Sequence, residues 1–197
     1  MDQMLQDTER LSGEIVVYDT EYTAWEGSQE CGWSRPGELR ELIQIAAIRV
    51  DVDRDFEEID VLDLLVRPLR NPVLSEYVSD LTGIDQNQII TKGRHPANAL
   101  HAFGAFCGST KAWSYGRDDL VLAENRSLVA MAPSPHRGGF GDLRPGLAQA
   151  GISIEDRTSG TLHKAVGICM QGQPHNALFD VRSILACLKV LRSLDRL

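Results

Sequence analysis

One apolar run near the start of the chain ends in two carboxylates, and this pattern constrains the fold more than any other. Residues 14–18 read Glu-Ile-Val-Val-Tyr, and Asp19, Thr20 and Glu21 follow directly. Such a run is typical of a buried strand. Because side chains alternate along a strand, Asp19 and Glu21 should point to the same face at its end. The sequence therefore predicts a buried strand that carries two neighbouring acidic groups.

Two carboxylates held this close repel each other, and they stay ionised at neutral pH when a positive charge lies between them. A hard divalent cation with oxygen ligands, Mg²⁺ or Mn²⁺, supplies that charge. The alternative is a strand that ends in a polar turn, with Asp19 and Thr20 as a cap. For these residues alone the polar turn is the better interpretation, so the decision depends on the rest of the chain.

The charge balance limits the kinds of partner that the chain can bind. Its 197 residues include 20 Lys and Arg against 28 Asp and Glu, which gives a net charge of −8. Such a chain does not bind duplex nucleic acid by charge alone. An enzyme that neutralises its own acidic site with metal can still bind a short strand locally. With 43% hydrophobic residues, the chain can form a sizeable core, and its length fits one domain.

No segment is predicted to target the chain to a membrane. Residues 1–6 contain no basic region and no long apolar stretch, so we expect no signal peptide. No apolar run reaches the roughly 18 residues that a membrane span needs. The four cysteines are scattered without a CxxC pair, which favours reduced thiols over a zinc site or a disulfide framework. We expect a cytoplasmic protein with no membrane partner.

The hydrophobic pattern predicts an α/β fold with a mixed sheet. After a leader at 1–12, strands at 14–18, 42–50 and 56–66 would form an antiparallel meander, with a long loop at 22–40. Helices then alternate with short strands, which predicts further strands beside the meander and helices packed on the faces of the sheet. The predicted helices cover 75–81, 95–107, 118–131, 161–167 and 177–194, and the later strands cover 111–115 and 139–143.

Three further segments lie at the ends of predicted elements. Residues 114–119 read Ser-Tyr-Gly-Arg-Asp-Asp between a strand and a helix, and His175 and Asp180 begin the best amphipathic helix. Residues 81–84, Leu-Thr-Gly-Ile, follow a polar helix and read as a helix end with a glycine cap. Each segment has a simpler interpretation, because acidic residues favour helix starts and both His175 and Asp180 can be solvated.

Together these segments resemble the motifs of the DEDDh family of 3′-to-5′ exonucleases, the proofreading-exonuclease-like branch of the RNase H-like superfamily. The matching residues are Asp19-Thr20-Glu21, Leu81-Thr82-Gly83-Ile84, Ser114-Tyr115-Gly116-x-x-Asp119 and His175-x₄-Asp180. The resemblance covers roughly residues 13–195. Within the family the chain looks most like the branch that includes the ERI-1-type RNA exonucleases and a bacterial sporulation-kinase inhibitor.

The resemblance implies an α/β, RNase H-like mixed sheet flanked by helices, in a single exonuclease domain at 13–197. It implies a metal-dependent 3′-to-5′ exonuclease that releases 5′-monophosphates from single-stranded nucleic acid, with two Mg²⁺ or Mn²⁺ ions as cofactors. His175 would be the general base. The implied catalytic residues are Asp19, Glu21, Asp119, His175 and Asp180, and the implied metal ligands are Asp19, Glu21, Asp119 and Asp180.

Two adjacent aspartates compete for the second motif. The family carboxylate falls three residues after Gly116, so the resemblance implies that Asp119 completes the metal site. Adjacent residues on a helix diverge by about 100°, so only one of the two can face the end of the strand. We therefore expect Asp118 to point to solvent or to cap the helix.

The expected substrate is RNA or a short oligonucleotide rather than DNA, a preference that rests on the branch resemblance alone. We expect Thr20, Tyr22, Thr23, Trp25 and Tyr115 to contact it; Tyr115 stands where the family usually has Trp. The aromatic side chains of the loop at 22–40, which include Trp33, can stack on a base or anchor the loop onto the core.

Two other functions stay open from the sequence. One is a DNA exonuclease of the repair or proofreading type, which the low positive charge does not exclude. The other is a non-catalytic interaction or regulatory module on the same fold. The complete set of four carboxylates and one histidine argues against the module, since an inert binding protein has no need for all five.

Overall fold

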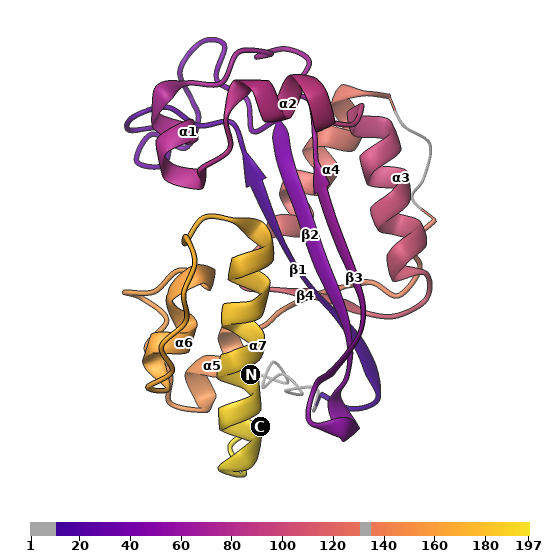
Figure 1. Ribbon diagram of the computed structural model, residues 1–197, viewed down its shortest axis with the longest axis vertical. Helices are drawn as coiled ribbons and strands as arrows, with labels where there is room; N and C mark the ends of the chain where they lie inside the picture. The colour runs from indigo at the N-terminus through magenta and orange to yellow at the C-terminus, as the bar shows by residue number, and fades with distance from the viewer. Residues whose placement is uncertain (1–10, 131–134) are drawn as a thin grey trace, which may run out of the picture.

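A five-stranded mixed sheet forms the centre of the structure (Figure 1). The structure is a computed structural model, and it describes residues 11–130 and 135–197. The strand order is β3-β2-β1-β4-β5, with antiparallel pairing within β3-β2-β1 and parallel pairing within β1-β4-β5. The predicted meander with parallel strands beside it is confirmed. Residues 1–10 of the predicted leader lie outside the described residues. The strands are β1 (Glu14–Tyr22), β2 (Leu42–Asp51), β3 (Glu57–Leu65), β4 (Ala112–Ser114) and β5 (Phe140–Asp142).

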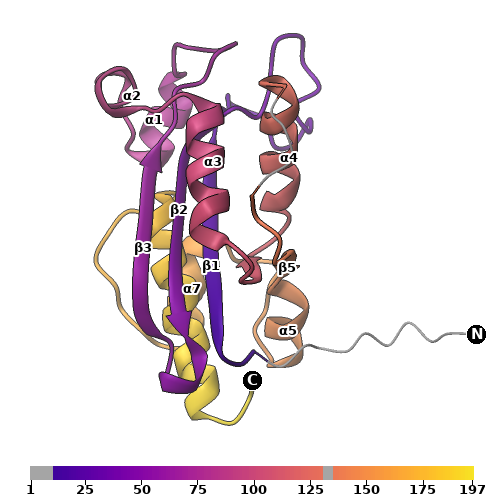
Figure 2. The same ribbon diagram turned by 90° about the vertical axis from the view of Figure 1, so that its right-hand side faces the viewer.

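Helices cover both faces of this sheet. Figure 2 shows α3 and α4 on one side of the strands and α7 on the other, while α1 and α2 lie beyond the end of β3. In the described part of the chain, no helix is long and apolar enough to cross a membrane. The helices are α1 (Glu76–Thr82), α2 (Gln86–Lys92), α3 (Pro96–Cys107), α4 (Asp118–Leu128), α5 (Arg144–Gln149), α6 (Leu162–Ala165) and α7 (Ala177–Ser193).

The sequence patterns did not predict α2 and α5. Helix α2 is too short to show a clear period, but its start carries a capping box. The Asp85 side chain accepts a hydrogen bond from the Gln88 backbone N–H at 2.8 Å, and the Gln88 side chain accepts one from the Asp85 N–H. The spacing Asp-x-x-Gln was therefore a usable signal. Helix α5 begins with Arg144-Pro145, where proline is tolerated in a first turn.

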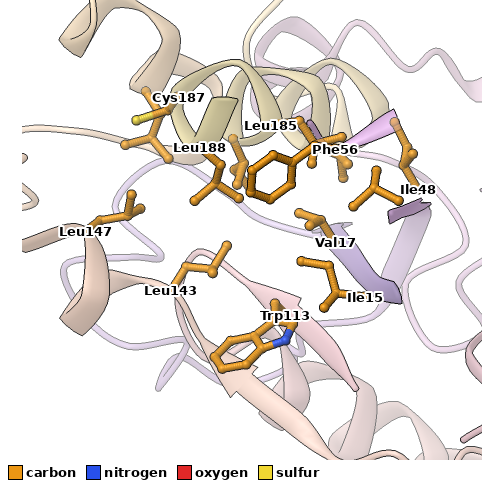
Figure 3. Close-up of a cluster of buried hydrophobic side chains, with 14 of the residues drawn as sticks. Ile15, Val17, Ile48, Phe56, Trp113, Leu143, Leu147, Leu185, Cys187 and Leu188 are labelled. Carbon is orange, nitrogen blue, oxygen red and sulfur yellow. The ribbon is translucent and has the colours of Figure 1, made fainter. Parts of the chain in front are cut away.

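Strand β1 is buried on both faces, and its side chains alternate between two cores. Ile15 and Val17 pack in the core under α7, and Figure 3 shows them between Leu185 of α7 and Trp113 of β4. Val16 and Tyr18 pack in the opposite core with residues of α3 and α4. Continuing this alternation along β1 assigns the two acidic residues that follow to the α7 face and Thr20 to the opposite face.

Two buried amides fix the helices that flank β1. The Asn125 side chain on α4 accepts a hydrogen bond from the Leu42 backbone N–H at 2.9 Å and donates one to the Arg40 carbonyl at 2.7 Å. The Gln44 side chain on β2 accepts a bond from the Ala177 N–H at 2.9 Å and donates one to Asp63 at 2.8 Å. The C-terminal half of α4 and the first turn of α7 are therefore tied to β2 and the residues just before it.

We expect Asn125→Ala to destabilise the protein by about 1–3 kcal/mol, because it leaves the buried Leu42 N–H and Arg40 carbonyl unpaired. Urea unfolding followed by circular dichroism measures the change. Ser127→Ala on the same helix is the control, since its exposed hydroxyl bonds only to the Ala123 carbonyl. Equal stabilities of the two variants would contradict the role of the Asn125 amide.

Candidate active site

Four carboxylates from three elements meet in one cleft. Asp19 and Glu21 come from β1, while Asp118 and Asp180 come from the first turns of α4 and α7. All four line a cleft of about 370 Å³, and His175 also lines it. Figure 1 shows how the arrowhead of β1 and the N-terminal end of α7 converge there. The fold thus brings together groups that lie about 160 positions apart in the chain.

The end of β1 holds its two acidic residues under the surface. Asp19 is 6% exposed and Glu21 is 9% exposed. Burial raises the pKa of both, and both are raised further by the charges of Asp180 and Asp118. Both residues therefore sense the same charges, as expected for side chains on one face. The pairing of β1 with β2 shifts register directly after Glu21, an irregularity that is common next to active sites.

Asp180 is the most buried of the four carboxylates, at 1% exposed. One oxygen accepts a hydrogen bond from the Ser159 hydroxyl at 2.8 Å, and the other accepts one from the His175 backbone N–H at 3.2 Å. A side chain at Gly160 would clash with this carboxylate, since a Cβ there would lie 2.4 Å from its Oδ1. The alternative that Asp180 is a solvated helix residue is therefore wrong.

His175 lies half-buried at the turn before α7 in a left-handed conformation, with φ of 64°. Its backbone N–H is held by Asp180, which offsets the strain that this conformation imposes on a side chain with a Cβ. Burial lowers the pKa of the imidazole, so the neutral form dominates at neutral pH. Possible ligand atoms of Glu21, His175 and Asp180 all lie within 4.8 Å of one another.

The structure orients the two aspartates of the second motif opposite to the expectation. Asp118 lines the cleft and accepts a hydrogen bond from the Thr20 hydroxyl at 3.2 Å. Asp119 instead forms a two-point ion pair with Arg117, at 2.8 and 3.0 Å. The expected orientation is wrong because α4 begins at residue 118, so this first residue faces β1 and the next one turns away.

The protein balances the negative charges of the cleft only in part. Burial raises the pKa of Asp118 to about 7 and that of Asp180 to about 6, and the pKa of Asp19 is raised by burial and three neighbouring carboxylates. Asp119, by contrast, has a pKa lowered by its pair with Arg117. Buried oxygen ligands with unbalanced negative charge are the donor set that suits hard divalent cations.

Of the residues expected to contact substrate, Thr20, Tyr22, Trp25 and Tyr115 line the cleft, and Thr23 does not. Thr20 is engaged by Asp118, and the carbonyl of Thr23 accepts a hydrogen bond from the Trp33 indole at 3.0 Å. The Tyr22 ring packs edge-on against Trp33 with 5.4 Å between centroids. These contacts anchor the loop at 22–40 onto the core. Trp25 and Tyr115, like Tyr22 and Trp33, also line the cleft.

Sequence patterns did not identify several residues of this site. Ser159 and Gly160 hold Asp180 from a short turn 21 and 20 positions earlier, and Gln44 holds the start of α7 from β2. Single serines, glycines and glutamines carry no pattern that distinguishes them from others in the chain. Arg144 and Arg157 also line the cleft, and only the fold shows that they do.

Comparison with known proteins agrees with this geometry. The sequence pattern of the exonuclease family RNase_T matches residues 16–188. No curated protein sequence matches the chain. The chain therefore belongs to the RNase_T exonuclease family.

Three solved structures show the same fold. A 3′-exonuclease that recognises the 3′ end of a histone mRNA stem-loop has a TM-score of 0.77 at 20% identity, over 92% of this chain and 64% of that chain. The nuclease domain of 3′hExo bound to rAMP, a DEDDh family member, has a TM-score of 0.75 at 20% identity, over 96% of this chain and 94% of that chain. A zinc-bound E. coli ExoI complex with single-stranded DNA has a TM-score of 0.68 at 19% identity, over 93% of this chain and 41% of that chain.

The acidic cluster makes the stability of the metal-free protein depend on pH. Burial raises the pKa of Asp118 to about 7 in the folded state, whereas an unfolded Asp titrates near 3.9. The unfolded chain therefore loses this proton first, and stability falls as the pH rises from about 4 to about 7. We expect Asp118→Asn to raise the Tm of EDTA-treated protein at about pH 8 and to change it little at about pH 4.

The matched control is Asp119→Asn. The folded pKa of Asp119 is lowered by Arg117, so its charge does not destabilise the folded state above the unfolded pKa. Its replacement should leave the Tm at about pH 8 unchanged or slightly lower. A stabilising Asp119→Asn together with a neutral Asp118→Asn would contradict the orientation described for this pair.

Proposed function

We propose that the protein is a metal-dependent 3′-to-5′ exonuclease that removes 5′-monophosphates one at a time from single-stranded nucleic acid. The observation that supports this most directly is the meeting of Asp19, Glu21, Asp118 and Asp180 beside His175 in one cleft. The catalytic carboxylate of the second motif is then Asp118 rather than Asp119. Family membership supplies the reaction class. The proposal adds the 3′-to-5′ direction of cleavage, the single-stranded substrate and the roles of the residues.

The four carboxylates would hold two divalent ions, Mg²⁺ or Mn²⁺. When bound, two such ions stabilise the attacking and leaving oxygens of a phosphodiester. Asp19, Glu21 and Asp180 would provide one site, and Asp19 with Asp118 the other. The zinc ion named for E. coli ExoI belongs to that protein. The preference for Mg²⁺ or Mn²⁺ here rests on the oxygen-only carboxylate set.

His175 would act as the general base. Its ring is neutral at neutral pH because burial lowers its pKa, so it can accept a proton from the attacking water. The bond from its backbone N–H to Asp180 fixes the turn that presents the ring. Ser159 fixes the same carboxylate from the other side at 2.8 Å.

The substrate would be a single strand with a free 3′ end. Tyr22, Trp25 and Trp33 all line the cleft. Because Tyr22 and Trp33 pack against each other and Trp33 anchors the loop, we assign base stacking to Trp25. The related proteins bind a histone mRNA stem-loop, rAMP and single-stranded DNA. We favour RNA or short oligonucleotides over DNA. The proposed location remains the cytoplasm, as the sequence predicts.

We expect Asp118→Ala and Asp180→Asn to abolish cleavage of an end-labelled single strand in Mg²⁺ or Mn²⁺, since each removes a metal ligand. Asp119→Ala should keep a near-normal rate because that side chain does not line the cleft and is paired with Arg117. Gel analysis of RNA and DNA strands labelled at the 5′ end measures rate, polarity and sugar preference together.

The same assay includes Ca²⁺ and EDTA. Ca²⁺ prefers longer bonds and looser geometry than Mg²⁺, so it should bind without supporting cleavage. Equal rates in Ca²⁺ and Mg²⁺ would count against the two-metal site. A wild-type protein that binds but never cleaves either strand would favour the non-catalytic module instead.

We expect His175→Ala to slow single-turnover cleavage by about 10²–10⁴-fold, the usual contribution of a general base, while Mn²⁺ affinity by calorimetry stays near normal. The close group of Glu21, His175 and Asp180 also allows His175 to be a ligand. A normal rate together with much weaker Mn²⁺ binding would assign it that role.

A further inference from the structure

Arg157 lines the cleft without a partner among the described residues. Its Nε atom is buried and makes no hydrogen bond there. A buried N–H donor that stays unpaired costs about 1–3 kcal/mol, and an arginine almost never loses its charge. A guanidinium held in this way beside a polar cleft is suited to an anionic group that the protein itself does not supply.

The other arginines of the cleft already have acidic partners. Arg40 pairs with Glu124, Arg117 with Asp119 at 2.8 Å, and Arg144 with Asp142 at 2.7 Å. Their charges are largely neutralised within the protein. Among the arginines that line this cleft, Arg157 thus has the charge most available to a ligand.

Tyr115 fixes the segment that carries Arg157. The Tyr115 hydroxyl donates a hydrogen bond to the Ile154 carbonyl at 3.1 Å, three positions before the arginine. Both Tyr115 and Arg157 line the cleft. Tyr115 stands where the sequence resemblance expects Trp, and it supplies a hydroxyl that Trp lacks.

Arg157 lies in the segment between α5 and α6, whereas the four carboxylates of the same cleft come from β1, α4 and α7. We therefore assign to Arg157 an anion other than the phosphate that the carboxylates and their ions would hold. A single strand that enters this cleft carries such an anion, namely the next phosphate of its backbone.

We propose that Arg157 binds a non-scissile backbone phosphate of the substrate strand, and that Tyr115 is the residue that positions it. This inference rests on the proposed function. If Arg157 holds this phosphate, tight binding requires a charged phosphate at the linkage next to the scissile one. The substrate is then an oligonucleotide rather than a mononucleotide ester.

The first experiment measures binding of a fluorescent single strand to the Asp180→Asn protein by anisotropy across a series of salt concentrations. Adding Arg157→Met should weaken binding about 10-fold and reduce the slope of log affinity against log salt by about 0.7, the value for one phosphate contact on a single strand. Arg54→Met is the charge-matched control, since Arg54 is exposed in the β2–β3 turn and pairs with Glu57. It should leave both quantities unchanged.

The second experiment locates the phosphate. A strand with an uncharged methylphosphonate at the linkage next to the scissile one should show a KM about 10-fold higher with wild-type protein and little change in kcat. The Arg157→Met and Arg157→Lys variants should show a smaller penalty, because they have lost all or part of the contact. If Arg157→Met does not fold, Arg157→Lys carries this test.

A third experiment uses the variant Tyr115→Phe, which removes only the Tyr115 hydroxyl. It should raise KM for the normal strand in the same direction as Arg157→Lys and reduce the methylphosphonate penalty, which a merely structural loss would not do. A wild-type enzyme that cleaves normally but tolerates the methylphosphonate, or an Arg157→Met variant with unchanged KM and salt slope, would overturn this inference alone. A wild-type protein that neither cleaves nor binds the strand would instead contradict the proposed function.

Discussion

The mutual repulsion of the buried carboxylates is the constraint on which the rest of the structure depends. Acidic side chains in a low-dielectric cleft tend to move apart or to take up protons, and neither response is compatible with binding a cation between them. The fold resists the first response by fixing the backbones that carry these groups. Asn125 ties α4 to β2, and Gln44 ties the start of α7 to the same strand. A bound cation would prevent the second response, because it stabilises the ionised carboxylates so that they do not take up protons.

The sequence was most informative where a clear hydrophobic pattern and burial coincide. The strand that became β1 is a continuous apolar run, the helix that became α7 is long enough for a period of 3.6 to be clear, and both lie in the core. Helices α2 and α5 have seven and six residues, too few for a period to emerge. Their boundaries depend on capping and on neighbouring chain segments rather than on a hydrophobic stripe.

The candidate site was predictable as a set of motifs but not in its register. Whether Asp118 or Asp119 faces β1 depends on where α4 begins and on the Thr20 hydroxyl across the cleft, and both are tertiary facts. The aromatic loop shows the same limit. Trp25 and Trp33 have equal stacking potential in the sequence, and only the indole bond from Trp33 to Thr23 identifies an anchor. Contacts between distant segments decided each case.

The site gathers its acids from β1, α4 and α7, so it exists only after the chain has been made through its last helix. Until α7 docks, Asp180 and His175 are absent from the end of β1, and contacts across such a sequence distance form late because loop closure must precede them. A chain still in synthesis therefore lacks the complete set of carboxylates, because Asp180 has not yet reached the end of β1. In this architecture, nuclease activity therefore requires that α7 has already folded against the end of β1.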